Sequence, residues 1–529
     1  MIADNLHLLM FAAAFIALLG GYHVALTLGG IALAFAGIGI GLDVFEPRAL
    51  IFWPGRILGN MSNQVLAAIP LFVLMGVVLE KSRVAEDLLE AAGRMLSGVR
   101  GGLGYSVILV GALLAASTGI VGATVVTMSL IALPSMLSQG YDKRISTGVI
   151  AASGTLGQII PPSIVLIVLA DAISNANAQA RQASGLPPSP VSAGDLFSGA
   201  LIPGLILVGL YLSYIALMSV LKPGLMPART AQQIADADDV PLSRTVFAFG
   251  APLVLILSVL GSILGGFTSP TEAASVGAIG ATLLAGARTR LDEAKRGWTY
   301  TASLAGAGAL LFLIALVWLI KLGIVGGLTP QDPPSEFFTT TMTGHLIAVA
   351  VTIIIPIGLI GALVALFKAK TLDVSLKGAA EVTSMVFLIL ICASLFSIVF
   401  RELGGDVFVE ELLKQAPGGL WGALAFTMIA VFVLGFFLDF LEIVFIIVPL
   451  VAPPLIALGA DPIWLGVLIA MNLQTSFLTP PFGFALFYLK GSAPPSVTTP
   501  DIWRGAIPFI ALQAIGLLAV ILIPQLVMR

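Results

Sequence analysis

The chain has 529 residues, of which 58% are hydrophobic and only 10% are charged, and its formal net charge is −3. A soluble domain carries about 25% charged residues, so this chain has too few charges to cover a water-facing surface. The composition predicts a polytopic membrane protein, with the lipid bilayer as its surroundings. No basic block indicates a nucleic-acid partner, and the single cysteine, Cys392, excludes an internal disulfide or a thiolate metal cluster.

Apolar runs long enough to cross a bilayer follow one another along the chain. They lie near 6–41, 64–79, 101–138, 145–170, 197–221, 245–267, 270–287, 303–326, 343–367, 382–400, 417–458, 463–490 and 505–526. The first run has no basic n-region and no clear cleavage site before it, so we interpret it as a membrane segment rather than a signal peptide. The fold class expected is all-α.

Three polar stretches interrupt these runs. Residues 80–100 place apolar side chains on one helical face, which is typical of an amphipathic helix on a membrane surface; the four are Val84, Leu88, Leu89 and Ala92. The stretch 173–196 has the Pro, Ser and Gly content of a flexible loop, and 222–244 is a second connector. Basic residues gather in 81–100, 288–296 and 368–377, which the positive-inside rule places in the cytoplasm.

Two double prolines interrupt apolar runs at related positions. Residues 131–171 align without a gap on 450–490 with seven identities, of which five are Pro, Gly or Asp. They are Pro134/Pro453, Gly140/Gly459, Asp142/Asp461, Ile150/Ile469, Ala151/Ala470, Pro161/Pro480 and Pro162/Pro481. The pattern predicts a duplicated transport unit with a broken helix at the same place in each copy. The alternative is that similar turns arose independently between helices.

A broken helix survives in a membrane only where protein or a water-filled cavity satisfies its freed backbone. Transporters use such breaks to bind cations with carbonyl oxygens and anionic substrates with helix N-termini. Gly154 and Gly157 precede Pro161, and side-chain oxygens crowd the second break at Asn472, Gln474, Thr475, Ser476 and Thr479. The sequence therefore predicts two ion-binding breaks; the alternative is kinked helices whose polar groups bond to neighbours.

Ionisable residues inside apolar runs are candidate functional residues. Asp439 lies within VLGFFLDFLEIVFIIVPL with no basic residue nearby, and Glu442 lies one turn later. Each could instead be a hydrogen-bonded structural acid. Lys321 is interpreted as snorkelling to an interface, and Asp171 and Lys490, which occupy equivalent places in the two copies, as solvated segment ends.

SPTEAASVGA, beginning at Ser269, resembles a site because Glu272 is an acid beside an apolar run. Ser269, Pro270 and Glu272 also form the pattern of a capping box with proline at the first helical position. We interpret the stretch as a helix start.

Six stretches together resemble the large membrane subunit of tripartite ATP-independent periplasmic (TRAP) transporters, over about residues 7 to 526. They are GTLGQIIPPS, NLQTSFLTPPFG, AIPLFVLMG (Ala68–Gly76), TGIVGAT (Thr118–Thr124), FTSPTEAASVGA and GFFLD. The resemblance implies two inverted repeats with helical hairpins and broken helices, and an elevator-type transport domain moving against a scaffold. It also implies sodium as coupling ion, a small membrane subunit, a periplasmic solute-binding protein that delivers a small organic acid, and a place in the bacterial inner membrane.

Carried onto this sequence, the resemblance places hairpin centres near Ala68–Gly76 and Ala393–Ser397. It implies substrate-binding residues Pro70, Gly76, Ser394, Ser397, Gln158 and Gln474. It implies sodium-binding residues Thr118, Gly119, Gly154, Gly157, Pro161, Asp439, Asn472, Thr475 and Pro480. The expected organisation is 1–59 N-terminal scaffold helices, 60–175 first transport repeat, 176–300 loop, scaffold helices and connector, 301–378 extra membrane segments, 379–495 second transport repeat and 496–529 C-terminal helix.

The chain departs from the family pattern in two respects. Ile120 and Val121 stand where many relatives have consecutive serines, so the first cation site has lost possible ligands. The chain is also longer than the usual large subunit, through the 173–196 loop and two extra segments, 303–326 and 343–367, for which contact with the small subunit is one interpretation.

Other functions stay open on the sequence alone. A one-component sodium- or proton-coupled carboxylate transporter would share the broken helices, and a passive channel is a further possibility. An intramembrane enzyme is disfavoured, because none of the three histidines (His7, His23 and His345) adjoins a polar break. The organic acid itself cannot be read from the sequence.

Overall fold

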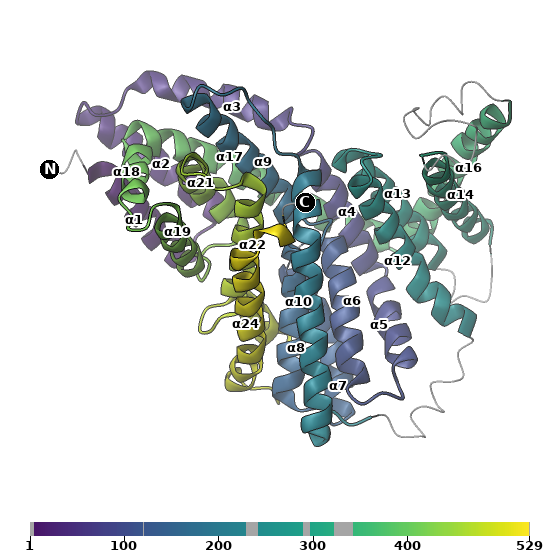
Figure 1. Ribbon diagram of the computed structural model, residues 1–529. Helices are drawn as coiled ribbons and strands as arrows, with labels where there is room; N and C mark the ends of the chain where they lie inside the picture. Colours follow the sequence, from purple (N-terminus) through teal and green to yellow (C-terminus); the bar gives the residue numbers. More distant parts are fainter. Residues whose placement is uncertain (1–4, 120, 229–241, 289–296, 322–341, 528–529) are drawn as a thin grey trace. The chain divides into compact units, whose positions relative to one another are not determined.

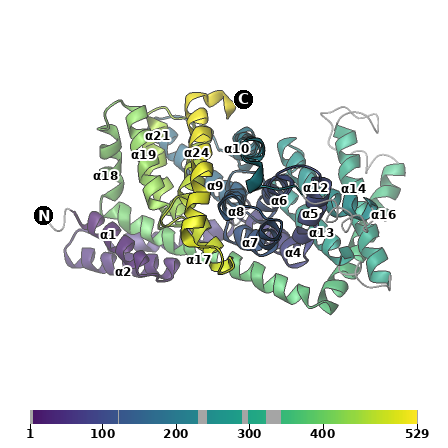
Figure 2. The same cartoon turned by 90° about the horizontal axis from the view of Figure 1, so that it is seen from below.

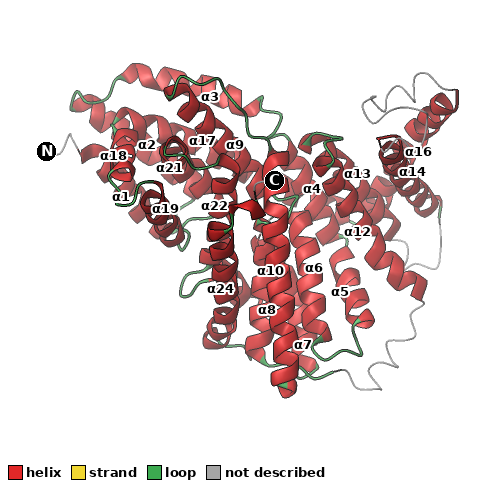
Figure 3. Cartoon of the chain, in the orientation of Figure 1, coloured by secondary structure: helices red, strands yellow, loops and turns green. Residues whose placement is uncertain are grey.

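The computed structural model describes residues 5–119, 121–228, 242–288, 297–321 and 342–527 (Figure 1). Within these ranges the chain forms helices, turns and loops and no strand (Figure 3). Eight of the described helices are long and apolar enough to cross a membrane, and shorter apolar helices accompany them. The prediction of an all-α polytopic membrane protein is confirmed.

The chain divides into two compact units. The first comprises Met1–Pro70, Gly93–Asp236 and Glu381–Arg529, and the second comprises Leu71–Ala92 and Ala237–Ala380. Two helices, α4 (Ala68–Lys81) and α17 (Thr371–Glu402), contribute to both units. In the first unit α1 (Leu6–Leu19) and α2 (Val24–Gly41) lie side by side (Figure 2), and α3 (Phe52–Met61) follows them.

The second unit holds the two predicted extra segments. Its other helices are α5 (Val84–Met95), α12 (Leu242–Leu264), α13 (Pro270–Arg288), α14 (Trp298–Lys321) and α16 (Met342–Lys368). Segments 303–326 and 343–367 are confirmed as α14 and α16, except that 322–326 lies outside the described residues. The two helices pack through glycines: a Cβ added to Gly358 would lie 2.6 Å from the Cα of Gly306. Only glycine permits backbones to approach so closely.

The predicted helix start at Ser269 is confirmed. The backbone N–H of Ser269 donates to Glu272 Oε2 at 2.8 Å, and the N–H of Glu272 donates to Ser269 Oγ at 3.3 Å. These reciprocal bonds satisfy two N–H groups that have no partner inside the helix. Glu272 is therefore used in capping α13.

The duplicated unit is present at a constant offset of 319 residues. Helix α7 (Val121–Ser138) corresponds to the stretch Phe440–Ala457, which is built from α20 (Phe440–Glu442), a π-helical turn η5 (Ile443–Ile447) and α21 (Val448–Ala457). Helix α8 (Lys143–Thr155) with the turn η3 (Leu156–Gln158) corresponds to α22 (Pro462–Leu478). Equivalent elements thus begin at equivalent residues.

Single residues agree as well as elements. Gly140 and Gly459 both have positive φ, at 81° and 104°. Asp142 accepts from the N–H of Arg144 at 2.9 Å, and Asp461 accepts from the N–H of Trp464 at 2.9 Å, so each caps the helix that follows it. Turns that arose independently would not share these conformations at a constant offset of 319 residues, so the duplication is confirmed. Both Pro-Pro bonds, Pro161-Pro162 and Pro480-Pro481, are cis.

The two copies run in opposite directions. Helix α10 (Ala193–Leu221) follows the first copy through α9 (Ile164–Ala183), and α24 (Thr499–Leu522) follows the second through α23 (Phe484–Ser492). The N–H of Asp142, which precedes α8, donates to Leu225 O beyond the end of α10 at 2.9 Å, and Thr147 Oγ1 contacts Asp501 O at the start of α24 at 3.5 Å. At the other end of the bundle, Trp464 Nε1 in the first turn of α22 donates to Val520 O near the end of α24 at 3.0 Å. Helices α8 and α22 therefore begin at opposite ends, as inverted repeats require.

The expected hairpin centres at Ala68–Gly76 and Ala393–Ser397 are wrong. Both stretches lie within continuous helices, α4 and α17. The chain reverses instead between α6 (Gly102–Thr118) and α7, and between α19 (Leu420–Leu434) and α20. These two reversals are also related by the offset of 319 residues, so the hairpins belong to the repeats.

Two further expectations need correction. The stretch 173–196 is mostly helical, because α9 continues to Ala183 and α10 begins at Ala193. The four apolar residues expected to face a membrane surface from 80–100 do share one face of α5, but that face is covered by protein, with Val84, Leu88, Leu89 and Ala92 at most 5% exposed. Most of the connector 222–244 lies outside the described residues.

Candidate functional site

The first hairpin touches the first helix break. Gly119 has φ +61°, and a Cβ added to it would lie 2.9 Å from Ile164 Cγ1 and 3.0 Å from Ile164 N, at the start of α9. A Cβ on Gly154 would collide with Val125 of α7. Both glycines of the predicted cation site therefore let backbone approach backbone where the prolines interrupt the helix.

The second hairpin touches the second break in the same manner. A Cβ on Gly435, at the end of α19, would lie 2.9 Å from Ser476 Cβ in α22. Asn472 Nδ2 donates to Met428 O of α19 at 2.7 Å. Each break thus lies against the hairpin of its own copy.

Two carboxylates lie at the tip of the second hairpin. Asp439 caps α20, with Oδ1 accepting from the N–H of Phe440 at 2.8 Å. Glu442 is 3% exposed, and its Oε2 has no hydrogen-bond partner among the described residues. Tyr488 of α23 lies close enough to interact with both charges, and its ring contacts Gly122 of the first hairpin. A buried carboxylate oxygen without a donor is a costly arrangement that a cation relieves.

A buried polar network connects the two copies. Gln474 Nε2 donates to Thr155 Oγ1 at 3.3 Å, and Gln513 Nε2 donates to Thr155 Oγ1 at 3.1 Å and to the Tyr211 hydroxyl at 2.8 Å. The carbonyl oxygens of Gln474 and Gln513, and both amide atoms of Gln158, are buried and have no partner in the described part of the chain. The interior between the breaks is therefore polar and only partly satisfied.

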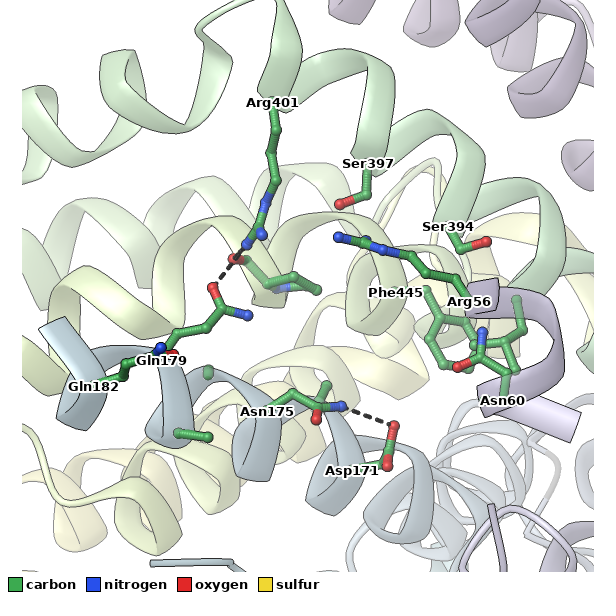
Figure 4. A pocket seen from close by; sticks show the side chains of 16 residues that line it. Arg56, Asn60, Asp171, Asn175, Gln179, Gln182, Ser394, Ser397, Arg401 and Phe445 are labelled. Carbon is green, nitrogen blue, oxygen red and sulfur yellow. Dashed lines mark hydrogen bonds between the residues drawn. The ribbon is translucent and has the colours of Figure 1, made fainter. Parts of the chain in front are cut away.

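A separate pocket of about 500 Å³ lies in the first unit, lined by α3, α9, α17, η5 and α21 (Figure 4). Two arginines line it, Arg56 from α3 and Arg401 from the end of α17. The other polar lining residues are Asn60, Asp171, Asn175, Gln179, Gln182, Ser394 and Ser397. Its two guanidinium groups distinguish this pocket from the second hairpin tip, where the charged groups are carboxylates.

The family model for "Tripartite ATP-independent periplasmic transporter, DctM component" matches residues 9–315 and 289–526 of the chain. The chain belongs to this family. It is thus a large permease subunit of a TRAP transporter, a multi-pass protein of the inner membrane.

Named relatives match this permease over most of their length. The "C4-dicarboxylate TRAP transporter large permease protein DctM" of Rhodobacter capsulatus is 27% identical, covering 84% of this chain and 83% of its own. The protein of the same name from Vibrio cholerae is 28% identical, covering 87% and 84%. Among solved structures, the Alcanivorax borkumensis YdaH transporter aligns with a TM-score of 0.50 at 13% identity, covering 89% of this chain and 88% of its own. That last likeness concerns the fold alone.

The permease gathers its predicted cation residues into two places. Gly119, Gly154, Gly157 and Pro161 surround the first break. Asn472, Thr475 and Pro480 belong to the second break, and Asp439 lies at the tip of the hairpin that packs against it. Thr118 ends α6 beside Gly119, and its side chain lies outside what the structure describes. The sodium roles of these residues stay predictions.

The predicted substrate residues of the permease belong to different structural elements. Ser394 and Ser397 line the arginine pocket, whereas Gln158 and Gln474 are fully buried near the breaks, and Pro70 and Gly76 lie in α4. Sequence reasoning missed Arg56 and Arg401. Both stand among apolar residues, in FWPGRIL and LFSIVFREL, and a basic residue inside so apolar a chain was the available signal.

Proposed function

We propose that this permease performs secondary active, sodium-coupled uptake of a small organic acid delivered by a periplasmic binding protein, in complex with a small membrane subunit. The observation that carries the proposal is the second hairpin tip. There Asp439 and the unpartnered Glu442 carboxylate belong to the hairpin whose Gly435 packs against Ser476 of the oxygen-rich second break. Sodium is a hard cation that binds oxygen ligands, and a buried pair of carboxylates suits a cation of this kind.

The residues divide the work in this proposal. Asp439 and the break at Asn472–Pro480 hold one cation, and the backbone around Gly119 and the Gly154–Pro161 break offers a second place with carbonyl oxygens alone. The N-termini of the helices that restart after each break offer N–H groups to the acid's carboxylate. We further propose that the hairpins and breaks move as one body against the remaining helices, in an elevator-type motion. Close glycine contacts between each hairpin and its break support a rigid moving body.

The partners follow from the type of transporter. The described part of the permease is membrane helix and connecting turn, so we propose that a binding protein captures the scarce solute outside the membrane. The names of the Rhodobacter and Vibrio relatives support a C4-dicarboxylate as the substrate class. A one-component carboxylate transporter that needs no binding protein is the alternative.

Reconstitution separates these functions. The permease is placed in proteoliposomes with and without the small subunit and the binding protein, and radiolabelled succinate accumulation is measured under a sodium gradient, a proton gradient or neither. We expect accumulation only with both partners and a sodium gradient. Accumulation by the permease alone would support the one-component alternative, and equilibration without accumulation would support a channel.

A further inference from the structure

The arginine pocket contains two like charges that the protein does not neutralise. Figure 4 shows the guanidinium of Arg56 turned toward that of Arg401. Neither arginine forms an ion pair with any residue that the structure describes. Burial and then the charge of Arg401 lower the pKa of the Arg56 guanidinium below its usual range, as expected where two positive charges repel each other.

The donors of these arginines are largely unused. Arg401 Nη2 donates to Gln179 Oε1 at 2.9 Å and approaches Pro449 O at 3.5 Å, while its Nε is buried without a partner. Arg56 donates no hydrogen bond to the described residues. An arginine has five N–H donors in a planar fork, so most of this donor capacity is left for a ligand.

The nearby carboxylate does not change this balance. Asp171 lines the same pocket, yet it accepts from Asn63 Nδ2 at 2.7 Å and from Asn175 Nδ2 at 3.3 Å rather than from an arginine (Figure 4). With two arginines and one carboxylate lining it, the pocket carries a formal charge of +2 − 1 = +1. An anion is therefore favoured and a cation is not.

Neutral donors complete the pocket. Ser397 is 9% exposed, its hydroxyl has no partner among the described residues, and it lines the cavity next to Ser394. The volume of about 500 Å³ falls in the range of small-molecule sites, about 300–1,000 Å³. An Arg fork matches a carboxylate in shape and charge.

We propose that this pocket is a binding site for a small organic anion with two acidic groups, one held by Arg56 and the other by Arg401. This site is separate from the hairpin tips, and it receives the substrate before or after the cation-coupled step. The inference rests on the proposed function for the substrate class. The same chemistry would hold the phosphate of a lipid headgroup, so the test has to distinguish a free dicarboxylate from a lipid.

The test measures binding without transport. The permease, purified with its small subunit in a phosphatidylcholine nanodisc, is titrated with malonate, succinate and glutarate, and with butyrate as a monoanion of similar size. The readouts are calorimetric affinity and the thermal unfolding midpoint. We expect at least one dicarboxylate to bind, and Arg56→Gln and Arg401→Gln each to weaken its binding by roughly tenfold or more, the size of a lost charge-assisted hydrogen bond. Arg48→Gln is the matched control, because Arg48 lies close in sequence, is 85% exposed and lies outside the pocket.

Variants that keep the positive charge distinguish a lost ligand contact from a misfolded protein. Arg56→Lys and Arg401→Lys retain one positive charge but lose the planar fork, so we expect intermediate affinities. Failure of all three dicarboxylates to bind, or an equal loss in the Arg48→Gln control, would overturn the proposal. Stabilisation by added phosphatidylglycerol that both Gln variants abolish, with no effect of dicarboxylate, would identify a lipid site and would also overturn it.

The proposed function can fail independently. If dicarboxylate binding depends on both arginines but uptake is independent of sodium, the pocket is supported as a binding site and sodium coupling is contradicted. The opposite outcome is sodium-driven uptake in which both Gln variants leave the half-saturating substrate concentration and the binding affinity unchanged. That outcome would support sodium coupling and would overturn the proposal that the pocket binds substrate.

Discussion

Thr155 and Gln474 occupy equivalent positions in the two repeats, 319 residues apart, and they are hydrogen-bonded to each other at 3.3 Å. Residues that a two-fold axis exchanges can touch only next to that axis. The axis therefore passes between α8 and α22. Pro161 and Pro480 each lie six residues beyond this pair, so the two breaks lie at equal distances from the axis, between the two ends of the bundle.

The Thr155 hydroxyl is expected to stabilise the contact between the repeats. Thr155→Val keeps the shape of the side chain but removes the acceptor for the Gln474 and Gln513 amides, which would stay buried. We expect a loss of about 1–3 kcal/mol in unfolding free energy, the cost of an unsatisfied buried polar group. Thermal unfolding of the purified permease measures it. Thr282→Val is the control, because that hydroxyl donates to Ala278 O within its own helix, and an equal loss there would contradict the role of Thr155.

Gly119 is expected to be essential for joining the first hairpin to the first break. Gly119→Ala places a methyl group 2.9 Å from Ile164 Cγ1. This distance is too short for two carbon atoms, so the hairpin must move. Gly185→Ala is a matched control, because Gly185 has φ +70° and open space around it. Both variants carry the cost of positive φ, roughly 1–2 kcal/mol, and only Gly119→Ala should abolish uptake in proteoliposomes. Equal uptake by the two variants would remove this contact from the transport cycle.

Asp439 is expected to set the affinity for sodium. Asp439→Asn keeps an oxygen that can cap α20 but removes the charge, so folding should persist. The sodium concentration for half-maximal uptake should rise by about tenfold, corresponding to about 1.4 kcal/mol of lost cation binding. Asp461→Asn, which also alters a helix-capping aspartate, should leave sodium dependence unchanged. Reduced thermal stability of Asp439→Asn with normal sodium dependence would indicate a structural acid instead.

The glycine contact between α14 and α16 is expected to hold the extra helices together. Gly358→Leu inserts a side chain where the Gly306 backbone lies, and overpacking of this kind typically costs about 1–3 kcal/mol. Gly308→Leu has open space around the substituted position and should be neutral. Limited proteolysis of residues 297–368 and the unfolding midpoint report the difference. Resistance of the Gly358 variant equal to that of the Gly308 variant would show that the pair does not depend on this contact.

The repeat could be predicted from the sequence because its markers are residues with fixed backbone roles. Pro161, Gly140 and Asp142 each impose a turn, a positive φ or a cap, and their equivalents keep those roles. The hairpins could not be located in the same way. Helices that are apolar on every face show no period, so nothing in composition marks where α6 ends and α7 begins.

The misplaced hairpin centres have a physical explanation. Pro70 is the third residue of α4, where the first turn tolerates proline, so it marks a helix start rather than a chain reversal. Ser394 donates to Ile391 O at 2.7 Å, so a hydroxyl in α17 is satisfied without a break. The stretch after Asp171 is rich in Ala, with two Gln residues, and these residue types favour helix, which overrides its polar composition.

The sequence marks Arg56 and Arg401 singly as basic residues in apolar surroundings, but it could not predict that they share a pocket. Arg56 and Arg401 belong to helices far apart in the chain, and only the packing of α3 and α17 around α9 brings them to one cavity. Ser394 and Ser397 are predicted substrate-binding residues, and both line this pocket.

The repeats agree up to the prolines and differ after them. Helix α9 has 20 residues, whereas α23 has nine. The additional length of α9 carries Asn175, Gln179 and Gln182, which line the pocket together with Asp171, and the equivalent of Asp171 is Lys490, which donates to Val497 O. The second copy therefore lacks the stretch of helix from which a matching pocket could be built. Two identical inverted repeats would make the permease equivalent when viewed from either face of the membrane. The longer α9 of the first copy removes this equivalence and makes the two faces different.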